Sequence, residues 1–220
     1  MSTVNLQQAK FNMIEQQVRP WDVLNPEILK TLDQVSREDF VPDQYKNLAY
    51  ADTSIPLGNG QFMMHPVVEG RMLQNLEIKA DDKILEVGTG SGYLTACLAQ
   101  LGSHIDSIEI DEGISKTAAG RLARKNITNV SLTIGDANSE TPAKKSYDVI
   151  AITGSMNECP QVYKDALKTG GRLFIITGDD PVMEASLITR IDDKSWAENI
   201  LFETSVKPLL HAETEKEFVF

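Results

Sequence analysis

The sequence predicts an α/β fold with a doubly wound, mostly parallel sheet, preceded by a helical extension and followed by antiparallel strands. Three observations point to this class. The segment from Lys83 to Gln100 contains a short apolar strand, a glycine-rich turn and a helix in immediate succession. Strand-like runs then alternate with helical runs as far as residue 180, as a parallel sheet requires. Beyond residue 180 two more strand-like runs follow each other without a helix between them.

The strand, turn and helix of residues 83–100 indicate a ligand site. Glycines at positions 88, 90 and 92 allow positive φ and let a ligand approach the backbone, while the following helix offers unpaired N–H groups. Glu86 stands just before the turn. Its carboxylate would repel the pyrophosphate of a dinucleotide, but it suits a cationic ligand such as the amino group of an amino acid.

Acidic residues also stand at the ends of the next two predicted strands. The run from His104 to Ile110 predicts the second strand, and Glu109 at its end can accept hydrogen bonds from both hydroxyls of a ribose. The third strand, residues 130–134, is followed by Gly135-Asp136-Ala137. Asp136 can accept a hydrogen bond from an adenine amino group, or it is an ordinary turn residue.

The first part of the chain predicts three helices. Residues 2–19 are amphipathic, and Asn25-Pro26 combines a capping residue with proline at the first helical position. A third helix begins at Pro66, and we expect Glu69 and Arg71 on its solvent side. Because no Gly/Ser-rich linker separates these helices from the rest, we expect a single domain, 1–220, in which residues 1–60 are an extension.

The remaining segments complete the predicted sheet. A buried fourth strand is expected at residues 147–153 and a fifth within 168–178, so that residues 66–180 form the ligand-binding core. Residues 187–191 and 196–206 are expected to pair as antiparallel strands around a charged turn. They belong to a C-terminal part, residues 181–220, that ends in an acidic tail.

The segment from Ser54 to His65 is a second candidate for the site. Its two glycines, Asn59 and Pro56 exclude a helix, and long non-helical loops inside compact domains are usually functional. A polar surface connection is the alternative. The residues in question are Gln61, Met63, Met64 and His65.

Composition excludes several classes of protein. The 220 residues, 41% of them hydrophobic, suit one domain of ordinary size. No apolar run is long enough to cross a bilayer and no secretion signal is evident, so we expect no membrane partner and a cytoplasmic location. The net charge of −11 opposes binding to nucleic acid. Cys97 and Cys159 are expected to be reduced, and no metal site is expected.

The quoted segments resemble known methyltransferases. The string from Glu86 to Gly92, E-V-G-T-G-S-G, is similar to motif I of class I S-adenosylmethionine-dependent methyltransferases, which have a Rossmann-like fold. From about Pro26 to Leu210 the chain resembles the protein-L-isoaspartate O-methyltransferase family, repair enzymes that methylate the abnormal carboxylate of isoaspartyl residues. The strings that carry this resemblance are R-E-D-F-V-P at 37–42, A-Y-A-D at 49–52 and I-P-L-G-N-G-Q at 55–61.

The resemblance implies a cofactor, a product and an acceptor. The cofactor is S-adenosylmethionine, S-adenosylhomocysteine is the product, and the acceptor is a peptide or protein carboxylate or a small molecule. The residues that the resemblance assigns to cofactor binding are Glu86, Val87, Gly88, Thr89, Gly90, Gly92, Glu109, Ile110, Asp136 and Ala137.

The chain departs from the family pattern in two places. After Gly-Gln the family reads Thr-Ile-Ser, and the Ser hydroxyl faces the reacting centre, whereas this chain has Phe62 and Met64 in place of Thr and Ser. A thioether cannot donate a hydrogen bond. Near the C-terminus the family carries Arg-Phe-Val-Pro-Leu, whereas this chain has S-V-K-P-L at 205–209. Both changes fall on the acceptor side, which predicts a divergent paralogue.

Several functional alternatives stay open at this stage. A carboxylate acceptor is already ionised at neutral pH and needs no general base, so we predict no catalytic residue. His65 is a base for a hydroxyl or amine acceptor, or a structural loop residue. A methyltransferase with another acceptor and a binding protein without turnover are the alternative functions. Glu86 and the glycine spacing disfavour a nicotinamide enzyme, and a monomer or a homodimer is compatible with the sequence.

Overall fold

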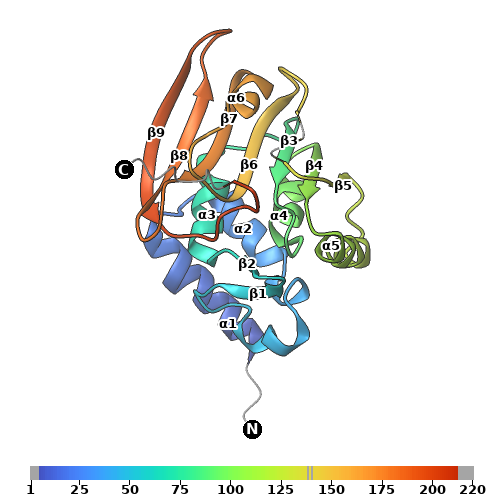
Figure 1. The fold of residues 1–220 in the computed structure, drawn as a ribbon. Helices are drawn as coiled ribbons and strands as arrows, with labels where there is room; N and C mark the ends of the chain where they lie inside the picture. Colours follow the sequence, from blue (N-terminus) through green and yellow to red (C-terminus); the bar gives the residue numbers. More distant parts are fainter. Residues whose placement is uncertain (1–4, 138, 140, 213–220) are drawn as a thin grey trace, which may run out of the picture.

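The computed structural model describes residues 5–137, 139 and 141–212. Its centre is a seven-stranded sheet in the order β5-β4-β3-β6-β7-β8-β9 (Figure 1). The strands that pair in parallel are β3 (Lys83–Val87), β4 (His104–Glu109), β5 (Val130–Ile134), β6 (Tyr147–Met156) and β7 (Leu167–Thr177). The last two, β8 (Met183–Arg190) and β9 (Trp196–Thr204), are antiparallel. The predicted fold class is confirmed.

Helices precede the parallel strands and connect β3 to β4, β4 to β5 and β6 to β7, whereas β5 and β6 are joined without a helix among the described residues, so the predicted alternation fails at this one connection. Those within the sheet region are α4 (Tyr93–Leu101), α5 (Glu112–Arg124) and α6 (Gln161–Ala166). Those before it are α1 (Leu6–Asn12), α2 (Pro26–Gln34) and α3 (Pro66–Asn75). After α1 the chain continues as a π-helix (Met13–Val18) and a 3₁₀ turn (Arg19–Trp21), and two further 3₁₀ segments cover Arg37–Asp39 and Asp43–Leu48.

A small hairpin stands apart from the main sheet. It consists of β1 (Ile55–Gly58) and β2 (Gln61–Met63), which pair antiparallel. Asn59 and Gly60 join them with φ of 51° and 72°, the left-handed conformation that tight hairpin turns require. The non-helical segment predicted at 54–65 is therefore an ordered hairpin followed by the start of α3.

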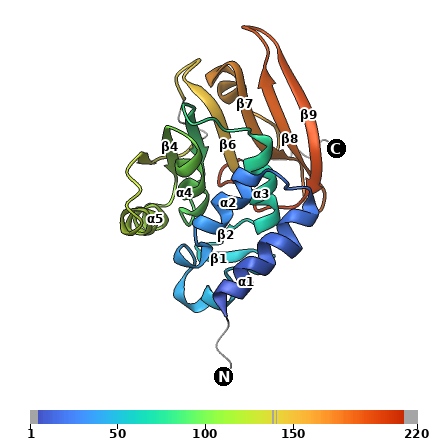
Figure 2. The same cartoon turned by 180° about the vertical axis from the view of Figure 1, so that it is seen from behind.

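The two faces of the sheet pack against different helices. Ile84 belongs to the core cluster that also contains Ile28 of α2 and Leu98 of α4. Leu85, the next residue, belongs to the opposite cluster with Tyr163 of α6. This alternation follows from the two-residue period of a strand and explains why the strands read as continuous apolar runs. Figure 2 shows α2 and α3 in front of the sheet.

Two sequence expectations about the helices need comment. The prediction that Glu69 faces solvent is wrong, because Glu69 is 3% exposed and Arg37, which is 0% exposed, donates from Nε to its Oε2 at 3.1 Å. The 3₁₀ segment that carries Arg37 covers the side of α3 that we expected to be wet. The first helix begins at Leu6, capped by Asn5, and residues 2–4 of its predicted range lie outside the described residues.

Three further observations concern the C-terminal tail, membrane-spanning helices and the two cysteines. The predicted acidic tail falls largely on residues 213–220, which lie outside the described residues. Across the part of the chain that is described, no helix is both long enough and apolar enough to traverse a lipid bilayer. Cys97 and Cys159 are both free thiols.

Candidate active site

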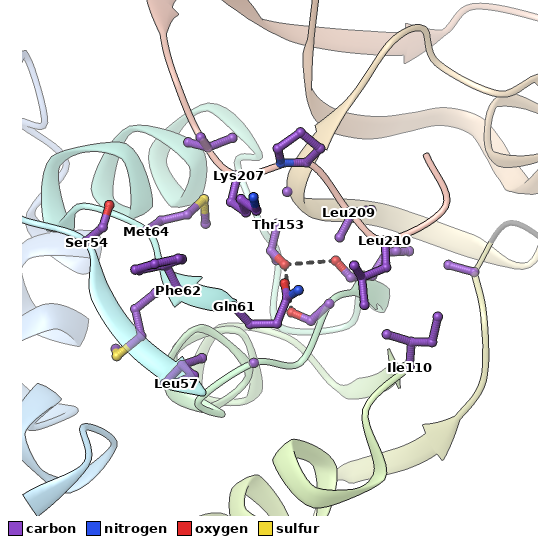
Figure 3. A pocket seen from close by; sticks show the side chains of 18 of the residues that line it. Ser54, Leu57, Gln61, Phe62, Met64, Ile110, Thr153, Lys207, Leu209 and Leu210 are labelled. Carbon is purple, nitrogen blue, oxygen red and sulfur yellow. Dashed lines mark hydrogen bonds between the residues drawn. The ribbon is translucent and has the colours of Figure 1, made fainter. Parts of the chain in front are cut away.

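A cavity of about 930 Å³ lies where the parallel strands β3, β4, β5 and β6 end. Ligands of open α/β sheets bind at this edge, and the volume is in the range of small-molecule sites. One side of the cavity is formed by the turns after these strands, another by the β1–β2 hairpin and the start of α3, and a third by residues 205–210. Figure 3 shows labelled side chains from all three, among them Ile110, Met64 and Leu209.

The glycine turn after β3 adopts a conformation that other residues rarely adopt. Gly88, Gly90 and Gly92 have φ of 93°, 53° and 84°. A Cβ at Gly88 would lie 2.4 Å from Oγ1 of Thr153 at the end of β6. That hydroxyl donates to the carbonyls of Val87 and Gly88 at 2.9 and 2.7 Å (Figure 3). Backbone at Gly88 and Gly90 therefore borders the cavity without side chains in the way.

Glu109 is held at the end of β4 by backbone N–H groups. Its Oε2 accepts from Gly90 at 2.8 Å, its Oε1 accepts from Asp111 at 3.1 Å, and it is 6% exposed. These two hydrogen bonds fix the orientation of the carboxylate. The side chain thus presents a fixed acceptor to the cavity, in contact with both the glycine turn and the start of α5.

Glu86 is placed differently. It is 0% exposed and does not line the cavity; its Oε2 accepts from Thr95 Oγ1 and Ser107 Oγ, each at 2.6 Å. Its Oε1 is buried and has no hydrogen-bond partner among the described residues. Burial raises the pKa of Glu86 to about 8, against the two hydroxyl hydrogen bonds. Thr89 and Gly92 are also outside the lining.

The far end of the cavity contains the residues predicted to contact adenine. Asp136 and Ala137 both line it. Oδ2 of Asp136 lies 2.7 Å from Nδ1 of His211, and the carbonyl of Ala137 accepts from the hydroxyl of Tyr163 at 2.6 Å. Of the predicted cofactor residues, the cavity therefore brings together Val87, Gly88, Gly90, Glu109, Ile110, Asp136 and Ala137.

The predicted acceptor loop forms the opposite part of the cavity. Gln61, Met63, Met64 and His65 all line it. The buried Arg37 anchors this loop, since its Nη2 donates to the carbonyl of Met64 at 2.6 Å. His65 lies with Nδ1 3.5 Å from Oδ1 of Asp52, at the rim.

Residues 205–210 close the cavity from the C-terminal side and are anchored on β6. The amide of Ser155 donates to the carbonyl of Lys207 at 3.2 Å, and the amide of Leu209 donates to the carbonyl of Ser155 at 3.0 Å. Sequence reasoning did not single out Thr153 or Ser155. The sequence marks these two residues only by their position, because both stand near the carboxyl end of a buried parallel strand.

A profile of the family described as "Protein-L-isoaspartate(D-aspartate) O-methyltransferase" matches residues 8–214. The chain belongs to this family. A "Protein-L-isoaspartate O-methyltransferase" of Aliivibrio salmonicida is 33% identical over 202 residues, which are 92% of this chain and 96% of that protein. One of Rhodopseudomonas palustris is 31% identical over 91% of this chain and 93% of the relative.

A solved structure is similar over almost the same length. It is that of a Plasmodium falciparum protein described as a protein-L-isoaspartate O-methyltransferase in complex with S-adenosyl-L-homocysteine. It has a TM-score of 0.78 and 20% identity, and covers 94% of this chain and 99% of its own. At this identity the likeness shows the fold, which is that of the class I methyltransferases. The family's Ser position is nevertheless occupied by Met64, which is 9% exposed beside the cavity.

Proposed function

We propose that the chain is an S-adenosylmethionine-dependent O-methyltransferase that methylates the carboxylate of isoaspartyl residues in damaged proteins. Family membership supports the reaction class. The observation that carries the proposal is that one cavity joins the glycine turn to the hairpin loop and to residues 205–210. A methyl donor on the turn and an acceptor at the loop would therefore share one space.

The residues around the turn fit the cofactor. The positive φ of Gly88 and Gly90 leaves backbone open to close approach, and only Leu57 Cδ1, at 3.4 Å, would meet a Cβ at Gly90. We assign the methionine moiety to residues 88–92, with Glu86 beneath the turn, the ribose to Glu109 and the adenine to Asp136 and Ala137. When bound, S-adenosylmethionine supplies a methyl group activated as a sulfonium and leaves as S-adenosylhomocysteine.

The protein's contribution to this reaction is alignment. An isoaspartyl carboxylate is ionised at neutral pH, so its oxygen attacks the methyl carbon without the help of a general base. The bond between methyl and sulfur breaks, and the electron pair stays on sulfur. The chain therefore needs to hold donor and acceptor in line and to exclude water, which the buried loop at Met63 and Met64 favours.

The acceptor assignment is tested with matched peptides. The purified protein is incubated with methyl-labelled S-adenosylmethionine and a peptide that contains one isoaspartyl residue, or the same peptide with ordinary aspartate. We expect a base-labile methyl ester on the isoaspartyl peptide alone. If neither peptide is labelled above background, this acceptor assignment is wrong.

A methyltransferase with another acceptor is the second candidate. Met64 favours it, because the hydroxyl that the family carries there is absent and the position is apolar. Labelling of a cell-extract component, with no labelling of the isoaspartyl peptide, would select this candidate, whereas cofactor binding without any labelling would indicate a protein without turnover. A cytoplasmic location and the choice between monomer and homodimer stay predictions.

A further inference from the structure

The electrostatics of the cavity disfavour an anionic acceptor. Four carboxylates, those of Glu109, Asp136, Asp179 and Asp180, line it, and the whole chain has a net charge of −11. A negatively charged peptide group approaching this cavity is therefore repelled by the field of the protein. Binding of a carboxylate requires a local donor or cation that offsets this repulsion.

Two residues with basic side chains line the cavity within the described residues, His65 and Lys207. His65 faces Asp52, with Nδ1 3.5 Å from Oδ1. The ammonium group of Lys207, in contrast, forms no ion pair and no hydrogen bond with any residue that the structure describes. Lys207 is exposed, so its Nζ is free to meet a ligand.

The backbone of Lys207 is fixed although its side chain is not. Ser155, 1% exposed, donates from N to the carbonyl of Lys207 and from Oγ to the carbonyl of Val206, at 3.2 Å each. Ser155 and Pro208 form a parallel bridge. The lysine thus projects from an anchored position at the cavity that Thr153 and Met64 also line (Figure 3).

The hydroxyls near this position are already engaged. Ser205 Oγ donates to Oδ1 of Asp180 at 2.6 Å, and the hydroxyl of Thr153 donates to backbone carbonyls of the glycine turn. Met64 offers no donor. The wall formed by residues 205–210 therefore contributes one unpaired cation to the cavity, the ammonium group of Lys207.

We propose that the ammonium group of Lys207 binds the carboxylate of the acceptor, in place of the neutral hydroxyl that Met64 lacks. This inference rests on the proposed function and names the group that selects its substrate. The reaction converts the carboxylate and the sulfonium into a neutral ester and a neutral thioether, so negative charge on the acceptor disappears as the transition state forms. Lys207 therefore stabilises the bound substrate more than the transition state, and it holds the ester product weakly.

The first test separates KM from kcat. Because the contact is solvent-exposed, Lys207→Gln raises KM for the isoaspartyl peptide about fivefold. The same variant leaves kcat unchanged or raises it, and Lys207→Arg restores most of the affinity. Lys194→Gln, which removes an exposed lysine of the β8–β9 turn, is the matched control and changes neither constant. An unchanged KM in Lys207→Gln, or a fall in kcat alone, overturns the proposal.

The second test does not depend on turnover. Binding of the isoaspartyl peptide is measured in the presence of S-adenosylhomocysteine and compared with the same peptide whose free carboxylate is replaced by a carboxamide. The unmodified protein binds the carboxylate peptide more tightly, and Lys207→Gln loses this preference. If methylation occurs but Lys207→Gln keeps the preference, only this inference fails. If the carboxylate preference depends on Lys207 but no ester forms, the proposed function fails alone. If no ester forms and Lys207→Gln also keeps the preference, the proposed function and this inference both fail.

Discussion

Gly88 combines a left-handed backbone conformation with a position in the lining of the proposed cofactor site. Its φ of 93° is strained for any L side chain, and an added Cβ would lie 2.4 Å from Thr153 Oγ1. Gly170 has a similar φ of 79° but open space around it. We expect both Gly→Ala changes to cost about 1–2 kcal/mol of backbone strain. Only Gly88→Ala should also weaken S-adenosylhomocysteine binding, measured by calorimetric titration; equal binding by both variants would contradict this.

Glu86 makes stability depend on pH. Burial raises its folded-state pKa to about 8 from the ordinary 4.5, so the folded protein retains a proton that the unfolded chain has already lost. Stability conferred by the protonated form is therefore lost as pH rises from about 4.5 to about 8. Relative to Glu86→Gln, the free energy of unfolding should fall by about 1.4 kcal/mol per pH unit in this window. Urea denaturation at pH 5, 6, 7 and 8 measures the free energy of unfolding of both proteins. If it depends on pH in the same way for both, the raised pKa of Glu86 is refuted.

At the scale of elements, the buried Arg37–Glu69 pair joins the first 60 residues to the proposed acceptor loop. Arg37 binds Glu69 of α3, donates to the carbonyls of Ala49 and Met64 at 3.0 and 2.6 Å, and lies over the ring of Tyr93 at the start of α4. Removing one partner leaves the other charge buried. Arg37→Met should cost about 3–5 kcal/mol in the free energy of unfolding, measured with urea.

Two variants distinguish the buried pair from a general effect of charge removal. The double change Arg37→Met, Glu69→Leu should cost less than Arg37→Met alone, because no uncompensated carboxylate remains. Arg19→Met removes a partner of the exposed pair with Glu15 and should change the free energy of unfolding by under about 1 kcal/mol. The loss of unfolding free energy in the double variant is compared with the sum of the losses in Arg37→Met and in Glu69→Leu. If the two are equal, the interaction between Arg37 and Glu69 does not explain the loss in Arg37→Met.

Asp111 connects α5 with the β1–β2 hairpin. Its Oδ1 accepts from the amide of Ile114 at 2.9 Å as the helix cap, and its Oδ2 accepts from Nδ2 of Asn59 at 2.6 Å. The hydrogen bond from Ile114 and then that from Asn59 lower its pKa. Asp111→Ala should cost about 1 kcal/mol in thermal or urea unfolding, whereas Asp111→Asn should keep the cap and most of that stability.

At the scale of the whole molecule, ligand binding should stabilise the fold according to affinity. At a concentration 100 times its Kd, S-adenosylhomocysteine should raise the free energy of unfolding by about 2.7 kcal/mol. NADH at the same concentration should have no effect, since the carboxylates of Glu109 and Asp136 line the cavity and would repel its pyrophosphate. Urea unfolding with each ligand measures the difference. A shift with NADH and none with S-adenosylhomocysteine would invert the cofactor assignment.

The fold could be predicted because its signals are local. Residues 130–134 read as a strand and form one, and Asn25-Pro26 starts a helix as its chemistry requires. The burial of Glu69 could not be predicted, because its partner is 32 positions away in a segment with no marked pattern. The anchoring of residues 206–209 on Ser155 is equally non-local, so the sequence indicated the altered segment and not the wall that it forms.

The bridge between Ser155 and Pro208 has a consequence for biosynthesis. All strands that carry the glycine turn, Glu109 and Asp136 have been translated before residue 160, whereas the wall formed by residues 205–210 is translated later. A nascent chain can therefore complete the proposed donor half of the cavity while the side formed by residues 205–210 is still open. Only when residues 205–210 have docked on β6 does the molecule possess a complete chamber in which to discriminate among its substrates.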